Sequence, residues 1–315
     1  MKPGRSCAVL SLAALPLLLQ ACSVLDHGFM NAQGPVAAHE RHFFLIVCGI
    51  LVFVALPVLV LVPVIAWHYR LSNTHHAYRP QWTFSWTLEG FIWIPPIGIV
   101  VLLACLLWPA TRRDDPYTRL AERGAPLRVQ AIGLDWKWVF VYPDEGIATV
   151  NQLAVPTGRP VQVELTSATV MQSMLMPQLA GQIYAMAGMR TRLNFAADRD
   201  GRYLGQNTQY NGDGFAHQKF DVLAMPDEAY RAWLARARAA GNALDSAAWR
   251  SLSARGLARP VAYASVPTGF FEQVLAESGG AAHGHAWARA AVPSAAPAPP
   301  PTDPGHPSHA TGKAR

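Results

Sequence analysis

The side chains that most often hold redox metals are scarce in this sequence. Its four cysteines are Cys7, Cys22, Cys48 and Cys105, and none follows residue 105. His217 is the only histidine between residues 77 and 282. Copper and zinc sites combine several thiolates, imidazoles or both. We therefore expect neither a disulfide nor a metal site in residues 106–282, and we expect His217 to be a surface or hydrogen-bonded histidine.

One cysteine has a context for covalent modification. A basic start and an apolar run over residues 8–19 lead through Gln20 and Ala21 into Cys22. This pattern is typical of a secretory signal with a lipobox. It predicts a signal peptide over residues 1–21, cleaved before Cys22, which then becomes a lipid-modified N-terminus. The alternative is a chance cysteine in an ordinary signal peptide.

Glu89 is the carboxylate best placed for proton chemistry. It stands at the start of the second long apolar run of the chain. A carboxylate at a membrane edge can exchange protons with bulk water and relay them inward. The alternative, which does not exclude the first, is an acid favoured by the dipole at a helix N-terminus.

Two apolar segments must position these groups. Residues 43–67 carry no charge, and as a helix they would extend about 37 Å, enough to cross a hydrocarbon core of about 30 Å. A second span is expected over residues 88–108. Aromatic side chains that suit the headgroup level lie near the span ends, namely Trp67, Tyr69, Trp82, Trp86 and Trp108.

Two rules disagree on the orientation of these spans. The loop of residues 68–87 holds only Arg70 and Arg79, whereas four arginines follow the second span, so charge counting places the C-terminus inside. Lipidation at Cys22 occurs on the outer face. We favour the lipobox, which predicts a periplasmic segment over residues 22–42, a cytoplasmic loop over 68–87 and a periplasmic C-terminal domain.

The rest of the chain changes pattern twice. Short alternating runs separated by Pro and Gly turns predict an all-β sandwich within residues 109–225. Residues 226–277 show helical apolar spacing at Tyr230, Trp233 and Leu234, which predicts a helical appendage. Residues 278–315 are rich in Ala, Pro and Gly and are expected to form a disordered tail, whose scattered histidines we interpret as solvated.

Composition limits the class of protein. The chain has 315 residues, is 51% hydrophobic and carries a formal net charge of +6. Its arginines are interspersed with carboxylates, so no phosphate-tracking stripe is evident and we expect no nucleic-acid partner. Membrane lipid or a partner subunit is the expected neighbour.

Four local motifs resemble subunit II of haem-copper oxidases, and in detail its quinol-oxidising, bo-type branch. They are LEGFIWIP at residues 88–95, GLDWKWVF at 133–140, GIATVN at 146–151 and YAMAGM at 184–189. The resemblance covers the chain from Cys22 to about residue 275. It implies a two-span hairpin followed by a cupredoxin-like sandwich.

The cytochrome c oxidising branch of that family holds a binuclear copper centre, with two bridging thiolates four residues apart, two imidazoles and a thioether. On this sequence the earlier histidine position falls on Met171. The remaining places fall on Asn207, Gln209, Asn211, Phe215 and Gln218. The resemblance thus implies a degenerate copper site that binds no metal.

The resemblance also implies a function. It indicates a subunit of a proton-pumping ubiquinol oxidase of the bacterial inner membrane, with Glu89 at the mouth of a proton-uptake path. Subunit I would hold two haems and one copper, and smaller subunits III and IV would complete the complex. Trp136 and Trp138 match the family's aromatic segment, and we interpret them as packing residues.

Two rivals remain from the sequence. A cytochrome c oxidase subunit II with an active copper centre is opposed by the missing cysteines. A free-standing membrane lipoprotein that uses the sandwich as a binding module is the alternative from another class.

Overall fold

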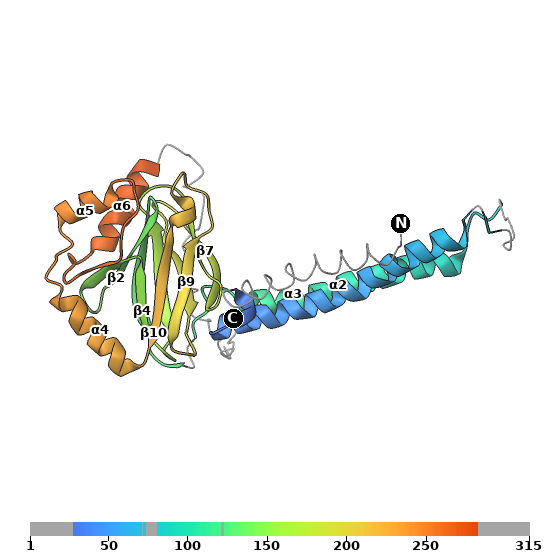
Figure 1. The fold of residues 1–315 in the computed structure, drawn as a ribbon, viewed down its shortest axis with the longest axis horizontal. Helices are drawn as coiled ribbons and strands as arrows, with labels where there is room; N and C mark the ends of the chain where they lie inside the picture. Colours follow the sequence, from blue (N-terminus) through green and yellow to red (C-terminus); the bar gives the residue numbers. More distant parts are fainter. Residues whose placement is uncertain (1–27, 71, 74–80, 121–122, 283–315) are drawn as a thin grey trace, which may run out of the picture.

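The computed structural model describes residues 28–70, 72–73, 81–120 and 123–282. A long helical hairpin projects from one side of a β-sandwich, and further helices cover the sandwich away from the hairpin (Figure 1). The predicted succession of two apolar helices, sandwich and helical appendage is confirmed. The signal peptide, Cys22 and the tail beyond residue 282 lie outside the described residues.

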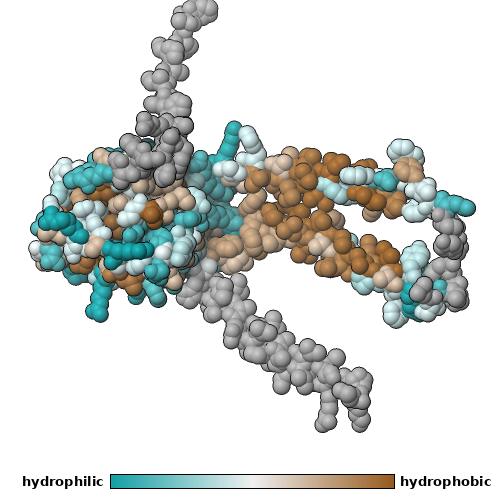
Figure 2. Space-filling model, turned by 90° about the horizontal axis from the view of Figure 1, so that it is seen from above, coloured by the Kyte–Doolittle hydropathy of each residue, from teal (hydrophilic) through white to brown (hydrophobic). Residues whose placement is uncertain are grey.

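The hairpin consists of α2 (Pro35–His68) and α3 (Trp86–Arg113), preceded by the short η1 (Phe29–Asn31). At 34 and 28 residues, the helices extend about 50 Å and 42 Å. Both helices extend beyond the expected spans of residues 43–67 and 88–108, and the added turns carry polar residues such as Glu40 and Arg112. Figure 2 shows the apolar band along the hairpin, and both helices are long and apolar enough to cross a membrane.

Two sheets form the sandwich. The first has the order β11-β3-β2-β1-β5-β8 and the second the order β4-β10-β9-β6-β7. The strands of the first sheet, in sheet order, are Val261–Tyr263, Ile147–Val150, Lys137–Tyr142, Leu127–Leu134, Val161–Ser167 and Thr191–Phe195. Those of the second are Gln152–Pro156, Lys219–Met225, Gly201–Asn207, Gln172–Met176 and Ala180–Ala185.

The main core lies between the sheets. Trp138, Phe140 and Tyr142 of β2 are fully buried there, next to Phe220 of β10. The Tyr142 hydroxyl donates to the Ala154 carbonyl at 3.0 Å and accepts from the Ala154 N–H at 2.8 Å. Burial raises the Tyr142 pKa far above its usual range, so this hydroxyl stays neutral and keeps both bonds.

The appendage covers a second core. It comprises α4 (Asp227–Ala239), α5 (Ser246–Ser253), the strand β11 and α6 (Phe270–Ala282). The expected helical appendage also contributes one strand, because β11 pairs antiparallel with β3 and extends the first sheet. The expected tail also begins too early, since α6 continues through residues 278–282.

The hairpin is joined to the sandwich where α2 begins. The Gln33 N–H donates to the Gln178 carbonyl at 2.7 Å, and the Asp198 N–H donates to the Gln33 carbonyl at 2.8 Å. A Cβ on Gly34 would lie 2.3 Å from the Ala196 carbonyl oxygen, so only glycine allows this approach. At the other helix, Asn194 bonds the Pro116 carbonyl through its N–H at 3.0 Å and its side chain at 2.9 Å.

Candidate functional site: a polar rim at one end of the sandwich

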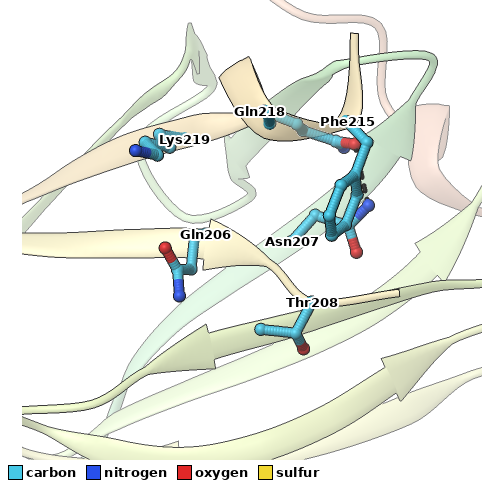
Figure 3. Close-up of a pocket in the computed structure, with 7 residues that line it drawn as sticks. Gln206, Asn207, Thr208, Phe215, Gln218 and Lys219 are labelled. Carbon is cyan, nitrogen blue, oxygen red and sulfur yellow. Dashed lines mark hydrogen bonds between the residues drawn. The ribbon is translucent and has the colours of Figure 1, made fainter. Parts of the chain in front are cut away.

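Most of the positions aligned with copper ligands of the related branch lie at one end of the sandwich, which we call the rim. It is formed by the β1–β2 turn, the start of β6 and the loop between β9 and β10, which contains η3 (Phe215–His217). Figure 3 shows Phe215 beside the amides of Asn207 and Gln218, at a hollow of about 220 Å³. That is below the roughly 300 Å³ at which ligand pockets usually begin.

Asn207 fastens the β9 end of the rim. Its Oδ1 accepts from the backbone N–H groups of Ser173 and Gln209, each at 3.0 Å. Its Nδ2 donates to the Gln209 carbonyl at 2.8 Å and to Gln218 Oε1 at 3.0 Å. The side chain is buried with both its oxygen and its nitrogen in use, so it ties β6, β9 and β10 together.

Gln218 lies at the centre of the rim and is only 1% exposed. Its Oε1 accepts from Asn207 and, at 2.8 Å, from Asn211 Nδ2. Its Nε2 donates to Gln172 Oε1 at 2.6 Å and to the Leu134 carbonyl at 3.2 Å. A glutamine fits this place because its amide offers both acceptor and donor capacity.

The residue on the β6 side that enters the rim is Gln172, which the sequence analysis missed. Gln172 is fully buried, and its Nε2 donates to the Leu134 carbonyl at 3.1 Å. Met171, the position aligned with a histidine ligand, is 40% exposed. Successive residues entering a strand face opposite ways, so a shift of one position exchanges the inward and outward side chains. The only signal in the sequence that could have pointed to Gln172 is an amide side chain directly beside the aligned position Met171.

The other predicted positions contribute less. The structure brings Asn211 and Phe215 to the rim, with Phe215 in edge contact with the exposed Tyr210 at a centroid distance of 5.6 Å. Asn211 Oδ1 is buried and accepts no hydrogen bond from a described residue. Gln209 contributes backbone atoms to the network. His217 is exposed at the end of η3.

The rim does not fit a binuclear copper centre. Such a centre needs bridging thiolates and imidazoles, and the groups that meet here are carboxamides and a phenyl ring. Moreover, the amide nitrogens of Asn207 and Gln218 donate to oxygens of the rim itself. An N–H that donates has no lone pair for a metal. The side chains of the rim can therefore form structural hydrogen bonds, but they offer no ligand set for a metal that would hold an electron.

The aromatic segment divides between rim and core. Trp138 is fully buried in the main core. Trp136 is half-buried in the β1–β2 turn, with a backbone φ of 69°, and its Nε1 donates to the Asn211 carbonyl at 3.3 Å. The Arg255 guanidinium lies 4.8 Å from its ring centroid. Trp136 thus connects the rim to the appendage.

Lys137 makes a second connection to the appendage. Its ammonium group donates to the Leu252 and Ala254 carbonyls at 2.8 Å and 2.7 Å, where α5 ends. A cation at this place stabilises unpaired carbonyls at a helix C-terminus. Burial lowers the pKa of Lys137, partly offset by the nearby carboxylate of Asp135.

Glu89 lies far from the rim, in the first turn of α3 at the end of the hairpin remote from the sandwich. Its backbone N–H donates to the Ser85 carbonyl at 3.0 Å. The Trp93 Nε1 donates to Glu89 Oε2, also at 3.0 Å. The structure therefore separates the amide network of the rim in the sandwich from a carboxylate at the far end of the apolar hairpin.

The fold and the rim define a class: a cupredoxin-like domain on a membrane hairpin, with the layout of oxidase subunit II. The family model described as "Cytochrome C oxidase subunit II, periplasmic domain" matches residues 145–224. The crystal structure of the periplasmic domain of that subunit from Bradyrhizobium japonicum covers 36% of this chain and 94% of its own, with 23% identity and a TM-score of 0.35.

Curated relatives narrow the class. "Cytochrome bo(3) ubiquinol oxidase subunit 2" of Pseudomonas aeruginosa is 37% identical over 275 residues, or 85% of this chain and 82% of the relative. "Ubiquinol oxidase subunit 2" of Acetobacter aceti is 38% identical over 264 residues, or 83% and 85%. The chain belongs to the subunit 2 family of ubiquinol oxidases. The family resemblance seen in the sequence is confirmed.

Proposed function

We propose that this chain serves a bacterial inner-membrane ubiquinol oxidase as its copper-free subunit II. The observation that carries the proposal is the amide network around Gln218, which occupies the place of metal ligands in a chain whose relatives are named ubiquinol oxidase subunits. Because the rim cannot accept an electron, electrons from ubiquinol reach oxygen through a neighbour.

That neighbour is subunit I, which would hold two haems and one copper, within a complex completed by subunits III and IV. In the overall reaction two ubiquinols give up four electrons and four protons, and one O₂ becomes two waters. The rim and core give subunit II a rigid body. The exposed apolar side chains of α2 and α3 supply the surface for lipid and partner helices.

The membrane placement follows from the same proposal. Cys22 carries lipid after removal of residues 1–21, residues 22–42 and the sandwich with its appendage lie in the periplasm, and residues 68–87 lie in the cytoplasm. The short distance along the chain from Cys22 to η1 supports this placement, because η1 leads directly into the joint at the sandwich.

Glu89 then lies at the cytoplasmic end of α3, and we assign it to the entrance of a proton-uptake path that continues in subunit I. Its place in the first turn supports this role, because a carboxylate there can exchange protons with water while its helix stands in lipid. The positive end of the helix dipole attracts the same charge.

Two measurements test the proposal. Purification of the tagged chain in mild detergent should recover a multi-subunit oxidase with haem absorbance and ubiquinol oxidase activity. A colourless chain recovered alone would instead indicate a free-standing binding module.

Glu89→Gln in the same complex should slow turnover about 100-fold, the low end of the contribution typical of one proton-transfer group. Subunit composition and haem content should be unchanged. Glu228→Gln, at an exposed glutamate in the first turn of α4, serves as the matched control. Undiminished proton uptake in Glu89→Gln would remove Glu89 from the mechanism.

A further inference from the structure

The tryptophan one turn after Glu89 has a polar atom aimed at the carboxylate. Glu89 and Trp93 are four residues apart in α3, so their side chains share one face of the helix. Trp93 Nε1 donates to Glu89 Oε2 at 3.0 Å, within normal hydrogen-bond geometry. The indole nitrogen can only donate a hydrogen bond, so Trp93 must be the donor and the Glu89 carboxylate the acceptor.

The contact restrains a side chain that is otherwise mobile. The backbone of Glu89 is already held by the Ser85 carbonyl at 3.0 Å. The bond from Trp93 fixes the outer end of the side chain as well. Among the described residues, none donates a hydrogen bond to Oε1 and none forms an ion pair with Glu89. One oxygen is therefore held while the other stays available to take up and release a proton.

The indole ring adds a second effect. Trp93 is 61% exposed on the hairpin, whereas Glu89 is half-buried. Apart from its N–H, the ring presents an apolar surface outward. Tryptophan suits this place because it combines a rigid apolar body with one polar handle.

We propose that Trp93 is a positioning residue that holds Glu89 in the orientation from which it passes protons inward. The inference rests on the proposed proton-uptake role of Glu89. Trp93 itself neither gains nor loses a proton in this step. It donates a hydrogen bond to Oε2 throughout, and the proton is exchanged at Oε1.

The test uses the complete oxidase in proteoliposomes, with proton uptake followed by a pH-indicator dye during turnover. Trp93→Phe keeps a ring and removes only the N–H donor. Proton uptake should become about tenfold slower, the low end of what is expected for loss of one hydrogen bond to a charged group. The KM for ubiquinol and the subunit composition should stay unchanged, which a general structural defect would not allow.

Three comparisons isolate the donor. Trp86→Phe is the matched control, because Trp86 is an exposed tryptophan of the same helix end for which no hydrogen bond to a described residue is recorded; it should behave as the parent protein. Trp93→Gln restores an N–H donor four residues from Glu89 and should recover part of the rate. Adding Trp93→Phe to Glu89→Gln should cause no further loss, because the two residues act as one unit.

The outcomes separate the two proposals. A slow Glu89→Gln with a normal Trp93→Phe overturns the positioning role and leaves the role of Glu89 intact. An equal further loss when Trp93→Phe is added to Glu89→Gln also overturns it, because Trp93 would then act independently. A normal Glu89→Gln overturns both proposals together.

Discussion

In the sandwich, large apolar side chains such as Trp138 and Phe140 are fully buried, whereas along the hairpin Leu59 and Phe91 are 70% and 79% exposed. The sandwich buries its apolar side chains in its own core, and amide hydrogen bonds hold its polar rim together. The hairpin does neither. The comparison teaches that the sandwich can hold its shape alone, while the hairpin is completed only by lipid and neighbouring helices, which is where proton chemistry is proposed.

The largest effect on the difference between the two regions is expected when the main core of the sandwich loses a large side chain. Trp138→Ala should lower the free energy of unfolding of the sandwich by about 3–5 kcal/mol, because it removes a fully buried indole and leaves a cavity. Chemical denaturation followed by aromatic fluorescence measures the change.

Leu59→Ala in α2 is the control for that measurement. It removes a large apolar side chain that the described residues leave 70% exposed, so the unfolding of the sandwich should not change. Equal destabilisation by both substitutions would show that the two regions do not differ as described.

A smaller effect is expected at the rim. Gln218→Met keeps the side-chain length and removes the amide, which leaves the Nδ2 groups of Asn207 and Asn211 without their common acceptor. The loss should be about 2–3 kcal/mol, the cost of leaving buried polar groups unpaired. Gln209→Met, whose side chain makes no recorded hydrogen bond among the described residues, should cost less than about 0.5 kcal/mol. Equal costs would contradict the network.

The smallest effect should come from a surface ion pair. Arg238 of α4 donates to Glu145 Oε2 at 2.5 Å and to the Glu145 carbonyl at 3.3 Å, with half of the arginine side chain exposed. Arg238→Ala should cost less than about 1 kcal/mol, because exposed pairs are screened by water and salt. Thermal unfolding at low and high salt checks this, and a loss as large as that for Gln218→Met would reverse the expected order.

The sequence predicts the hairpin well because long uncharged runs are an unambiguous signal. It predicts the ends less well. His39, Glu40 and Arg41 stopped the expected first span at residue 43, yet they continue α2 because they lie where the helix meets the sandwich. Helical geometry continues through polar residues when tertiary contacts hold them.

The rim shows where local pattern is insufficient. Asn207, Asn211 and Gln218 were found from the motif and do meet in space. Gln172 was not found, because which of two adjacent residues faces inward depends on the register of β6 with β9. Likewise, β11 is only three residues long, and its place beside β3 is set by the appendage as a whole.

The most direct test of the account is the copper content of this chain, purified within its oxidase and then separated from the other subunits. Elemental analysis, with a copper-binding cytochrome c oxidase subunit II as the reference, should find no stoichiometric copper on this chain while the complex oxidises ubiquinol. One or two tightly bound copper ions per chain would contradict it, because the rim would then hold the electron carrier that its amides are inferred to replace.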